Sequence, residues 1–102
     1  MVSGAGRQRS ILITGCSTGI GLAAARTLRA RGWRVIATAR KPGDLARLAE
    51  VEGLETIALE MGDPASVRTC AEDVLARTDR RLDALYNNAA YGMIGEIGRA
   101  HV

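Results

Sequence analysis

A glycine-rich segment near the start of the chain has residue types that suit the binding of an anion. It reads Thr-Gly-Cys-Ser-Thr-Gly-Ile-Gly over residues 14–21 and joins a short apolar run to an amphipathic stretch. Glycine lacks a Cβ atom, so the backbone can approach a ligand closely where glycines stand. The free N–H groups in the first turn of a following helix would point at an anion, and the helix dipole would favour negative charge. This chemistry fits a pyrophosphate, and the candidate residues are Gly15, Ser17, Thr18, Gly19, Ile20 and Gly21.

The same glycines have a second interpretation, in which they serve packing alone. A tight turn rich in glycine also lets a helix lie close to the preceding strand. Because the spacing by itself is a weak signal, the placement between an apolar strand and an amphipathic helix carries the prediction. Both interpretations stay open from the sequence.

A second candidate is Arg40, which follows the apolar run 33–38 near its end. A guanidinium can contact a phosphate through two parallel hydrogen bonds, each assisted by charge. The first 40 residues hold seven Arg and no acidic residue, whereas residues 41–102 hold seven basic and eleven acidic residues. A basic first segment suits an anionic partner, either a phosphate-bearing cofactor or a nucleic acid. A solvated arginine-rich surface is the plainer alternative for most of these residues.

The elements that must position these residues alternate along the chain. Apolar runs predict strands at 11–14, 33–38, 56–59 and 82–86, and periodic stretches predict helices from about 20 to 31 and from 64 to about 77. Residues 41–43 indicate a turn, after which Asp44 is expected to cap a short helix. This βαβαβαβ pattern predicts an α/β fold with a doubly wound, Rossmann-like parallel sheet in the strand order 3-2-1-4. Ligands of such sheets bind beyond the carboxyl ends of the strands at the switch point, next to strand one.

The spacing of apolar residues also predicts which helix faces are buried. The first helix is expected to bury Ile20, Ala23, Ala24 and Leu28. In the third helix, opened by Asp63 and Pro64, the expected buried set is Val67, Cys70, Ala71, Val74 and Leu75.

Composition limits the classes of protein that the chain can belong to. Of its 102 residues, 47% are apolar and 25% charged, which is typical of a globular domain rather than a disordered chain. No apolar run approaches the roughly 20 residues that span a membrane, so we expect a cytoplasmic protein. Cys16 and Cys70 lack partners at metal-ligand spacing, which predicts reduced thiols and no metal site. The expected organisation is a flexible segment 1–9, a nucleotide-binding half-domain 10–92 and a tail 93–102.

Two motifs together resemble those of the short-chain dehydrogenase/reductase family. They are Thr-Gly-x-x-x-Gly-Ile-Gly at residues 14–21 and Asn87-Asn88-Ala89 at the end of the fourth strand. The resemblance implies an oxidoreductase that transfers hydride between a nicotinamide and a carbonyl or alcohol. It also implies that Asn87, Asn88 and Ala89 brace the sheet and line the cofactor site. Glu60 and Met61 occupy the segment that contacts the adenine in the family.

The resemblance also bears on which dinucleotide is bound. Ala39 stands where members that prefer NAD usually carry Asp, an acid that would accept hydrogen bonds from the ribose diol. Arg40, the next residue, is placed to pair with a 2′-phosphate. We therefore expect NADP(H) to be preferred, with NAD(H) as the other possibility.

The catalytic residues of that family have no counterpart here. The family uses a Tyr, a Lys four residues later and an upstream Ser, but the sole Lys of this chain is Lys41. The sequence therefore predicts a truncated, cofactor-binding first half that is inactive alone, and it does not identify a substrate. The alternative is a non-catalytic nucleotide-binding module acting with a partner chain. The fourth strand would then be an exposed edge open to self-association. A nucleic-acid partner is disfavoured because no aromatic residues interleave with the arginines.

Overall fold

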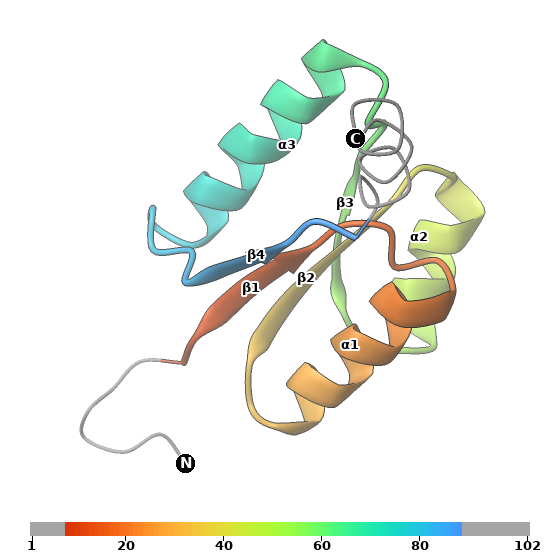
Figure 1. Ribbon diagram of the computed structural model, residues 1–102, viewed down its shortest axis with the longest axis vertical. Helices are drawn as coiled ribbons and strands as arrows, with labels where there is room; N and C mark the ends of the chain where they lie inside the picture. Colours follow the sequence, from red (N-terminus) through yellow and green to blue (C-terminus); the bar gives the residue numbers. More distant parts are fainter. Residues whose placement is uncertain (1–7, 89–102) are drawn as a thin grey trace, which may run out of the picture.

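The computed structural model describes residues 8–88, in which strands and helices alternate (Figure 1). The elements are β1 (Ser10–Ile13), α1 (Gly19–Ala30), β2 (Arg34–Ala39), α2 (Pro42–Glu50), β3 (Glu55–Ala58), α3 (Pro64–Arg77) and β4 (Ala84–Tyr86). Residues 1–7 of the expected flexible segment, the candidate Ala89 and the expected tail 93–102 lie outside the described residues.

The four strands form one parallel sheet in the order β3-β2-β1-β4. The predicted fold class and strand order are therefore confirmed. The register places Ile13 beside Ala37 on one side and beside Tyr86 on the other. Consequently, the loops that leave β1, β2 and β4 emerge at the same edge of the sheet, because parallel strands share their carboxyl ends.

The core lies in two layers, one on each face of the sheet. Alternate residues of a strand point to opposite faces, so Ile11 and Ile13 pack with α1 and α2 while Leu12 packs with α3. The same alternation in β2 sends Val35 to the first layer and Ile36 to the second. Both faces of β1 and β2 are covered, which explains their continuous runs of apolar residues.

The predicted buried face of α1 is only partly right. Ala24 and Leu28 pack against the core as expected, but Ile20 is 67% exposed and Ala23 is also exposed. The most deeply buried residues of the helix are Gly21 and Ala25. Residues 20–25 are nearly all apolar, so their period does not decide which stripe faces inward. These two small residues allow a close approach of the helix: Ala25 packs in the core against the sheet, and Gly21 lies against the loop that precedes the helix.

In α3 the predicted buried set is only partly right. Cys70 and Val74 are buried as expected, but Val67 is 38% exposed and Ala71 is exposed. Within residues 8–88 the apolar neighbours of this helix come from the sheet and its loops. Cys70, Val74 and the half-buried Leu75 make this contact. The helix start is as predicted, since the Asp63 carboxylate accepts a hydrogen bond from the Ala65 N–H at 3.0 Å.

The start of α2 also departs from the prediction. Lys41 rather than Asp44 occupies the N-cap position, and the helix begins at Pro42. Proline is favoured in the first helical turn because it has no N–H to satisfy and its φ is already helical. Asp44 lies within that first turn and pairs with Arg47 at 3.3 Å.

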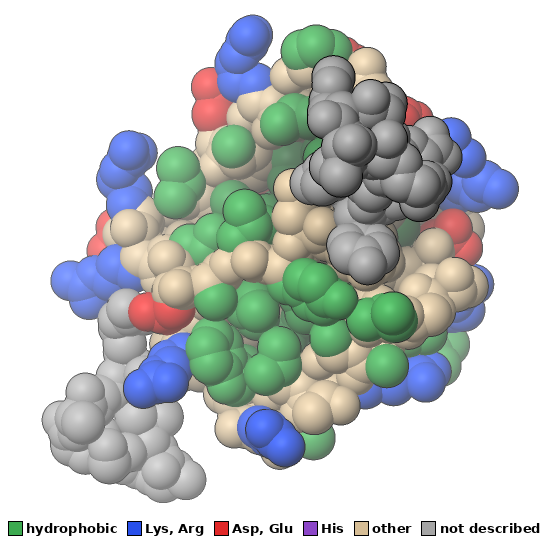
Figure 2. Space-filling view, viewed as in Figure 1, with side chains coloured by type: hydrophobic (Ala, Val, Ile, Leu, Met, Phe, Trp, Pro, Cys, Tyr) green, Lys and Arg blue, Asp and Glu red, His purple; other side chains and the backbone are tan. Residues whose placement is uncertain are grey.

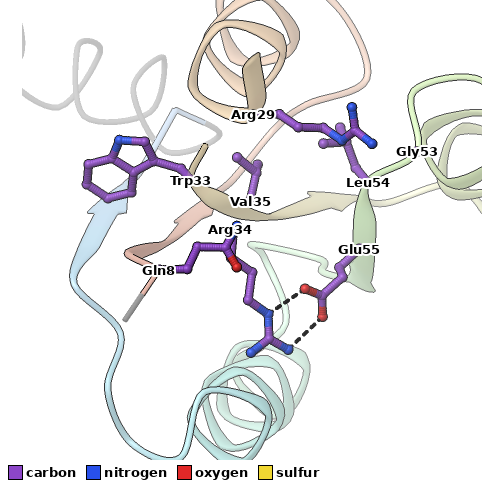
Figure 3. A pocket seen from close by; sticks show the side chains of 8 residues that line it. All are labelled: Gln8, Arg29, Trp33, Arg34, Val35, Gly53, Leu54 and Glu55. Atoms are coloured by element: carbon purple, nitrogen blue, oxygen red, sulfur yellow. Dashed lines mark hydrogen bonds and ion pairs between the residues drawn. The ribbon is translucent and has the colours of Figure 1, made fainter. Parts of the chain in front are cut away.

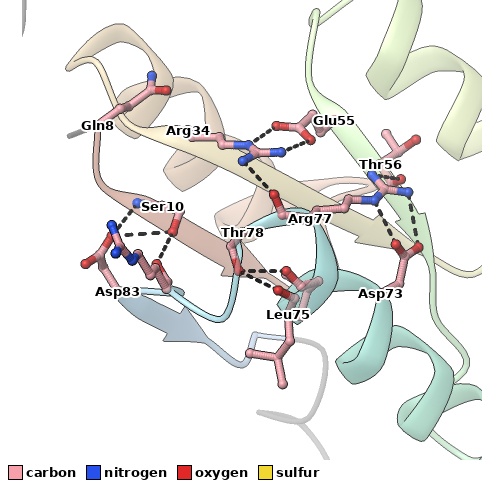
Figure 4. A network of polar contacts seen from close by, with 12 residues as sticks. Gln8, Ser10, Arg34, Glu55, Thr56, Asp73, Leu75, Arg77, Thr78 and Asp83 are labelled. Carbon is pink, nitrogen blue, oxygen red and sulfur yellow. Dashed lines mark hydrogen bonds and ion pairs between the residues drawn. The ribbon is translucent and has the colours of Figure 1, made fainter.

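A network of polar contacts closes the amino end of the sheet (Figure 4). Ser10 donates its hydroxyl to the Arg81 carbonyl at 2.9 Å and its N–H to the Asp83 carboxylate at 2.7 Å. Arg34 donates to the Arg77 carbonyl at 3.0 Å, which ties β2 to the end of α3. These contacts join segments about 40 to 70 residues apart in the sequence and so stabilise the closure of the sheet.

Strand β4 forms one edge of the described sheet and carries exposed apolar surface. Leu85 is 59% exposed, and hydrophobic side chains gather on both sides of β4 in the space-filling view (Figure 2). No helix within residues 8–88 has the length and apolar character needed to cross a membrane.

Candidate functional site

A hollow of about 210 Å³ lies at the carboxyl ends of β1, β2 and β3. It contains five of the predicted site residues, drawn from three separate loops. The residues that line it are Gly15, Ser17, Thr38, Ala39, Arg40, Leu59, Glu60 and Met61. The strand order 3-2-1 brings these loops together, as expected for the carboxyl edge of a doubly wound sheet.

The loop between β1 and α1 is held in place by Thr38 at the end of β2. The Gly15 N–H donates to the Thr38 hydroxyl at 3.3 Å, and the Cys16 N–H donates to the Thr38 carbonyl at 2.9 Å. Sequence reasoning missed Thr38. The available signal was a polar residue inside an apolar strand, since a buried polar group must find a partner.

A second residue that sequence reasoning missed is Arg47, on α2. Its Nη2 donates to the Ser17 carbonyl at 2.6 Å, and its other terminal nitrogen pairs with Asp44. The contact ties the loop to α2. No local pattern indicates it, because the two residues are 30 positions apart.

Gly19 begins α1 with a left-handed backbone, at φ +67°. A Cβ at this position would meet nothing within 4 Å, so the space in front of the helix start is open. Thr18 is the N-cap and makes no side-chain capping hydrogen bond. The first-turn N–H groups of a helix have no intrahelical acceptors, so this end of α1 can bind an anion.

Gly21 has a different role from Gly19. A Cβ on Gly21 would lie 2.3 Å from the Gly15 carbonyl oxygen and 2.8 Å from Nδ2 of Asn88. The packing interpretation therefore applies to Gly21, and its contact with a cofactor stays a prediction. The close approach is between α1 and the loop that it follows.

The two asparagines after β4 tie that strand to β1. Asn88 donates its amide to the Gly15 carbonyl at 3.1 Å, and Thr14 donates its hydroxyl to Oδ1 of Asn87 at 3.0 Å. The Thr14 N–H also donates to the Tyr86 carbonyl at 3.0 Å. Asn87 and Asn88 thus brace the carboxyl edge of the sheet beside the glycine-rich loop.

Arg40 and Glu60 face each other across the hollow. The Leu59 N–H donates to the Ala39 carbonyl at 3.0 Å, so the residues that follow, Arg40 and Glu60, emerge from neighbouring strands. Arg40 Nε lies 3.8 Å from Glu60 Oε1, and their side chains are 63% and 46% exposed. The backbone of Glu60 is anchored through its N–H to the Ser66 hydroxyl at 2.9 Å.

The two cysteines are structural. Burial raises the pKa of the Cys16 thiol to about 11, and the thiol donates to the Ile13 carbonyl at 3.1 Å. Burial also raises the pKa of Cys70. A raised pKa favours the protonated thiol at neutral pH, and the thiol is a far weaker nucleophile than the thiolate. Within residues 8–88 no group of three or more His, Cys, Asp or Glu side chains is placed to hold a metal ion.

A larger hollow, of about 490 Å³, lies at the opposite, amino end of the sheet (Figure 3). It is lined by Trp33 and Arg34 at the start of β2 and by Glu55 at the start of β3, among others. None of the predicted site residues lies there. Arg34 is engaged by Glu55 through two hydrogen bonds, of which Nη2 to Oε1 measures 2.9 Å. The smaller hollow therefore remains the candidate site.

Comparison with known proteins decides the family. The sequence model described as "short chain dehydrogenase" matches residues 9–101. The chain belongs to this family. It is 40% identical over 97 residues to the uncharacterized oxidoreductase YbbO of Escherichia coli, covering 95% of this chain and 36% of that protein. It is also 40% identical over 83 residues to the NADPH-dependent 1-acyldihydroxyacetone phosphate reductase of Schizosaccharomyces pombe, covering 80% and 28%.

Solved structures of the family share the fold. A short-chain dehydrogenase from Streptomyces avermitilis has a TM-score of 0.72 at 38% identity, over 80% of this chain and 31% of that one. An actinorhodin polyketide ketoreductase variant with NADPH has a TM-score of 0.69 at 28% identity, over 79% and 33%. The resemblance seen in the sequence motifs is thus confirmed. The chain spans about a third of the length of these relatives.

Proposed function

We propose that this short-chain dehydrogenase chain forms the NADP(H)-binding half of an oxidoreductase. The observation that carries the proposal is the shared position of Gly15, Ser17, Arg40 and Glu60 around one hollow beside the start of α1. Bound there, the dinucleotide would supply hydride exchange with a carbonyl or alcohol carbon. The residues of this chain would bind and orient it.

The geometry suits the two halves of the adenosine diphosphate moiety. The open space before Gly19 and the first-turn N–H groups of α1 would receive the pyrophosphate. Ser17 and Thr18 would add hydroxyl donors. The adjacent hollow would take the adenosine, with Met61 and Leu59 offering apolar contact. Asn87 and Asn88 brace this region, and Ala89 remains a predicted cofactor contact.

Preference for NADP(H) rests on Arg40. Its guanidinium lines the hollow at the end of β2, where Ala39 stands in place of the acid that members preferring NAD usually carry at this strand end. The reductase of Schizosaccharomyces pombe is described as NADPH-dependent, and the polyketide ketoreductase structure contains NADPH. Both observations support the same choice for this chain.

The chemical step needs groups beyond those in this sequence. Hydride transfer to a carbonyl develops negative charge on oxygen, which a proton donor must neutralise. The 102 residues contain no Tyr followed four positions later by Lys. We therefore propose that catalysis requires residues outside this sequence, while dinucleotide binding resides within it.

A nucleotide-binding module that acts with a partner chain at the β4 edge is the second candidate, favoured by the exposure of Leu85.

Calorimetric titration of NADPH and NADH tests the proposal. Trp33 lies at the amino end of β2, roughly 20 Å from the candidate site by strand length, so its fluorescence is a poor reporter. We expect tighter binding of NADPH, and Arg40→Ala should remove the preference. Because Arg40 is 63% exposed, we expect about tenfold, the lower end of 1.5–3 kcal/mol for a charged hydrogen bond.

Arg68→Ala is the matched control, since Arg68 is an exposed arginine on α3 outside the hollow. It removes the same charge and should leave both affinities unchanged. Equal affinities of the wild-type chain for NADPH and NADH would refute the NADP(H) assignment. A preference that survives Arg40→Ala would assign the phosphate contact to another residue.

A further inference from the structure

The residues that line the candidate hollow carry one positive and one negative charge. Arg40 is the cation and Glu60 is the anion, and the other lining side chains are uncharged. The first 40 residues contain no acid, so by sequence the surroundings of Arg40 are strongly basic. The fold changes this, because Glu60 comes from a segment 20 residues later. The site that would receive a 2′-phosphate is therefore electrically balanced.

The Glu60 carboxylate is oriented by its own turn. Its Oε2 accepts a hydrogen bond from the Gly62 N–H at 3.4 Å, while its Oε1 is directed at Arg40 Nε, 3.8 Å away. Within residues 8–88, Arg40 has no other hydrogen bond or ion pair. A phosphate that approached the guanidinium would thus meet a carboxylate already beside it.

We propose that Glu60 is a specificity-determining residue that weakens the discrimination by Arg40 between NADPH and NADH. The inference rests on the proposed function of the hollow. A bound 2′-phosphate would share the guanidinium with Glu60 and would be repelled by the carboxylate. NADH has a hydroxyl in place of that phosphate, so its binding depends less on the charge of Glu60. The ratio of the affinities for NADPH and NADH then depends on both Arg40 and Glu60, and not on Arg40 alone.

The size of the effect follows from exposure. Both side chains are about half exposed or more, and water and salt screen charges at such positions. Exposed ion pairs are coupled by a small free energy, which corresponds to a change of about two- to fivefold in a binding constant. Removal of the Glu60 charge should therefore raise the affinity for NADPH by about two- to fivefold.

The test is calorimetric titration of the Glu60→Gln chain with NADPH and NADH. Glutamine has nearly the same shape, and its amide oxygen can still accept from the Gly62 N–H. We expect tighter binding of NADPH, a smaller change in the binding of NADH, and a gain that shrinks as salt is added. Glu72→Gln, which removes an exposed acid of α3, is the matched control and should change neither affinity.

The double variant Arg40→Ala with Glu60→Gln separates the mechanisms. If Glu60 acts through Arg40, most of the gain from Glu60→Gln disappears once Arg40 is removed. A gain that persists in full would overturn the pairing. So would a Glu60→Gln chain with unchanged or weaker NADPH binding, or with equal gains for both cofactors.

Failure of the proposed function has its own signature. In that case the wild-type chain binds neither dinucleotide, although circular dichroism shows it folded, and the inference fails with it. If the wild-type chain binds NADPH and only the shift in Glu60→Gln is missing, the inference alone is wrong.

Discussion

Substitution of Gly21 by alanine probes the contact on which the glycine-rich loop depends. The added Cβ would lie 2.3 Å from the Gly15 carbonyl oxygen, about 0.7 Å inside the 3.0 Å below which real Cβ contacts do not occur. Helix α1 cannot easily move away, because Ala25, one turn later, is fully buried against the sheet. The strain must be relieved by the loop or by Asn88, whose amide would lie 2.8 Å from the new atom.

The expected cost combines three effects. Overpacking of this kind costs about 1–3 kcal/mol. Loss of the hydrogen bond from the Asn88 amide to the Gly15 carbonyl adds about 1 kcal/mol. Alanine is a better helix former than glycine, which offsets about 0.5–1 kcal/mol. The net loss of unfolding free energy is about 1–3.5 kcal/mol, equivalent to a fall in Tm of roughly 5–25 °C for a chain of this size.

Thermal and urea denaturation followed by circular dichroism measure this loss. Gly43→Ala is the matched control, because Gly43 lies in the first turn of α2 with nothing within 4 Å of an added Cβ and no positive φ. That control should be neutral or stabilising by up to about 1 kcal/mol. If Gly21→Ala were as stable as the wild-type chain, or if both variants lost equal stability, the assignment of Gly21 to packing would be refuted.

Four further outcomes are expected. Gly19→Val should abolish NADPH binding, since its side chain would enter the open space before α1. Valine is also strained at φ +67°, so we expect a loss of stability with most of the helicity retained. Unchanged affinity in a titration would reject the pyrophosphate site. The Arg34 hydrogen bond lowers the pKa of the Glu55 carboxyl, so the pair stabilises the fold above the ordinary value of 4.5, and this contribution is lost as pH falls through the lowered pKa. When denaturation midpoints are measured against pH, the Glu55→Gln chain should not show the loss of stability at low pH that comes from this pair. A pH profile identical to that of the wild-type chain would contradict the prediction. The purified chain should not oxidise NADPH with any carbonyl, and turnover would contradict this expectation. It should also self-associate at the β4 edge, and Leu85→Lys should reduce the apparent mass measured by light scattering. A monomeric wild-type chain would contradict the self-association.

Much of the fold could be predicted from local patterns. Apolar runs and helical periods recur at intervals that force parallel pairing, and the resulting order β3-β2-β1-β4 is observed. The cap of α3 by Asp63 was also predictable, because a capping side chain contacts a backbone group two residues away. The motifs at 14–21 and 87–89 indicated the family through their resemblance to its known motifs. Backbone hydrogen bonding and turn chemistry act over a few residues, so a sequence read in short windows contains them.

The tertiary structure alone decided which residues meet. Asn88 contacts Gly15 from 73 positions away, and Arg47 reaches the Ser17 carbonyl across 30. The buried face of α1 was likewise undetermined, because an alanine-rich helix offers several apolar stripes and only the shape of the sheet selects one. Glu60 lies beside Arg40 through strand register, which turned an apparently basic site into a balanced one. Such contacts depend on the packing of layers and the alignment of strands, and a linear pattern of residue types does not encode that distance information.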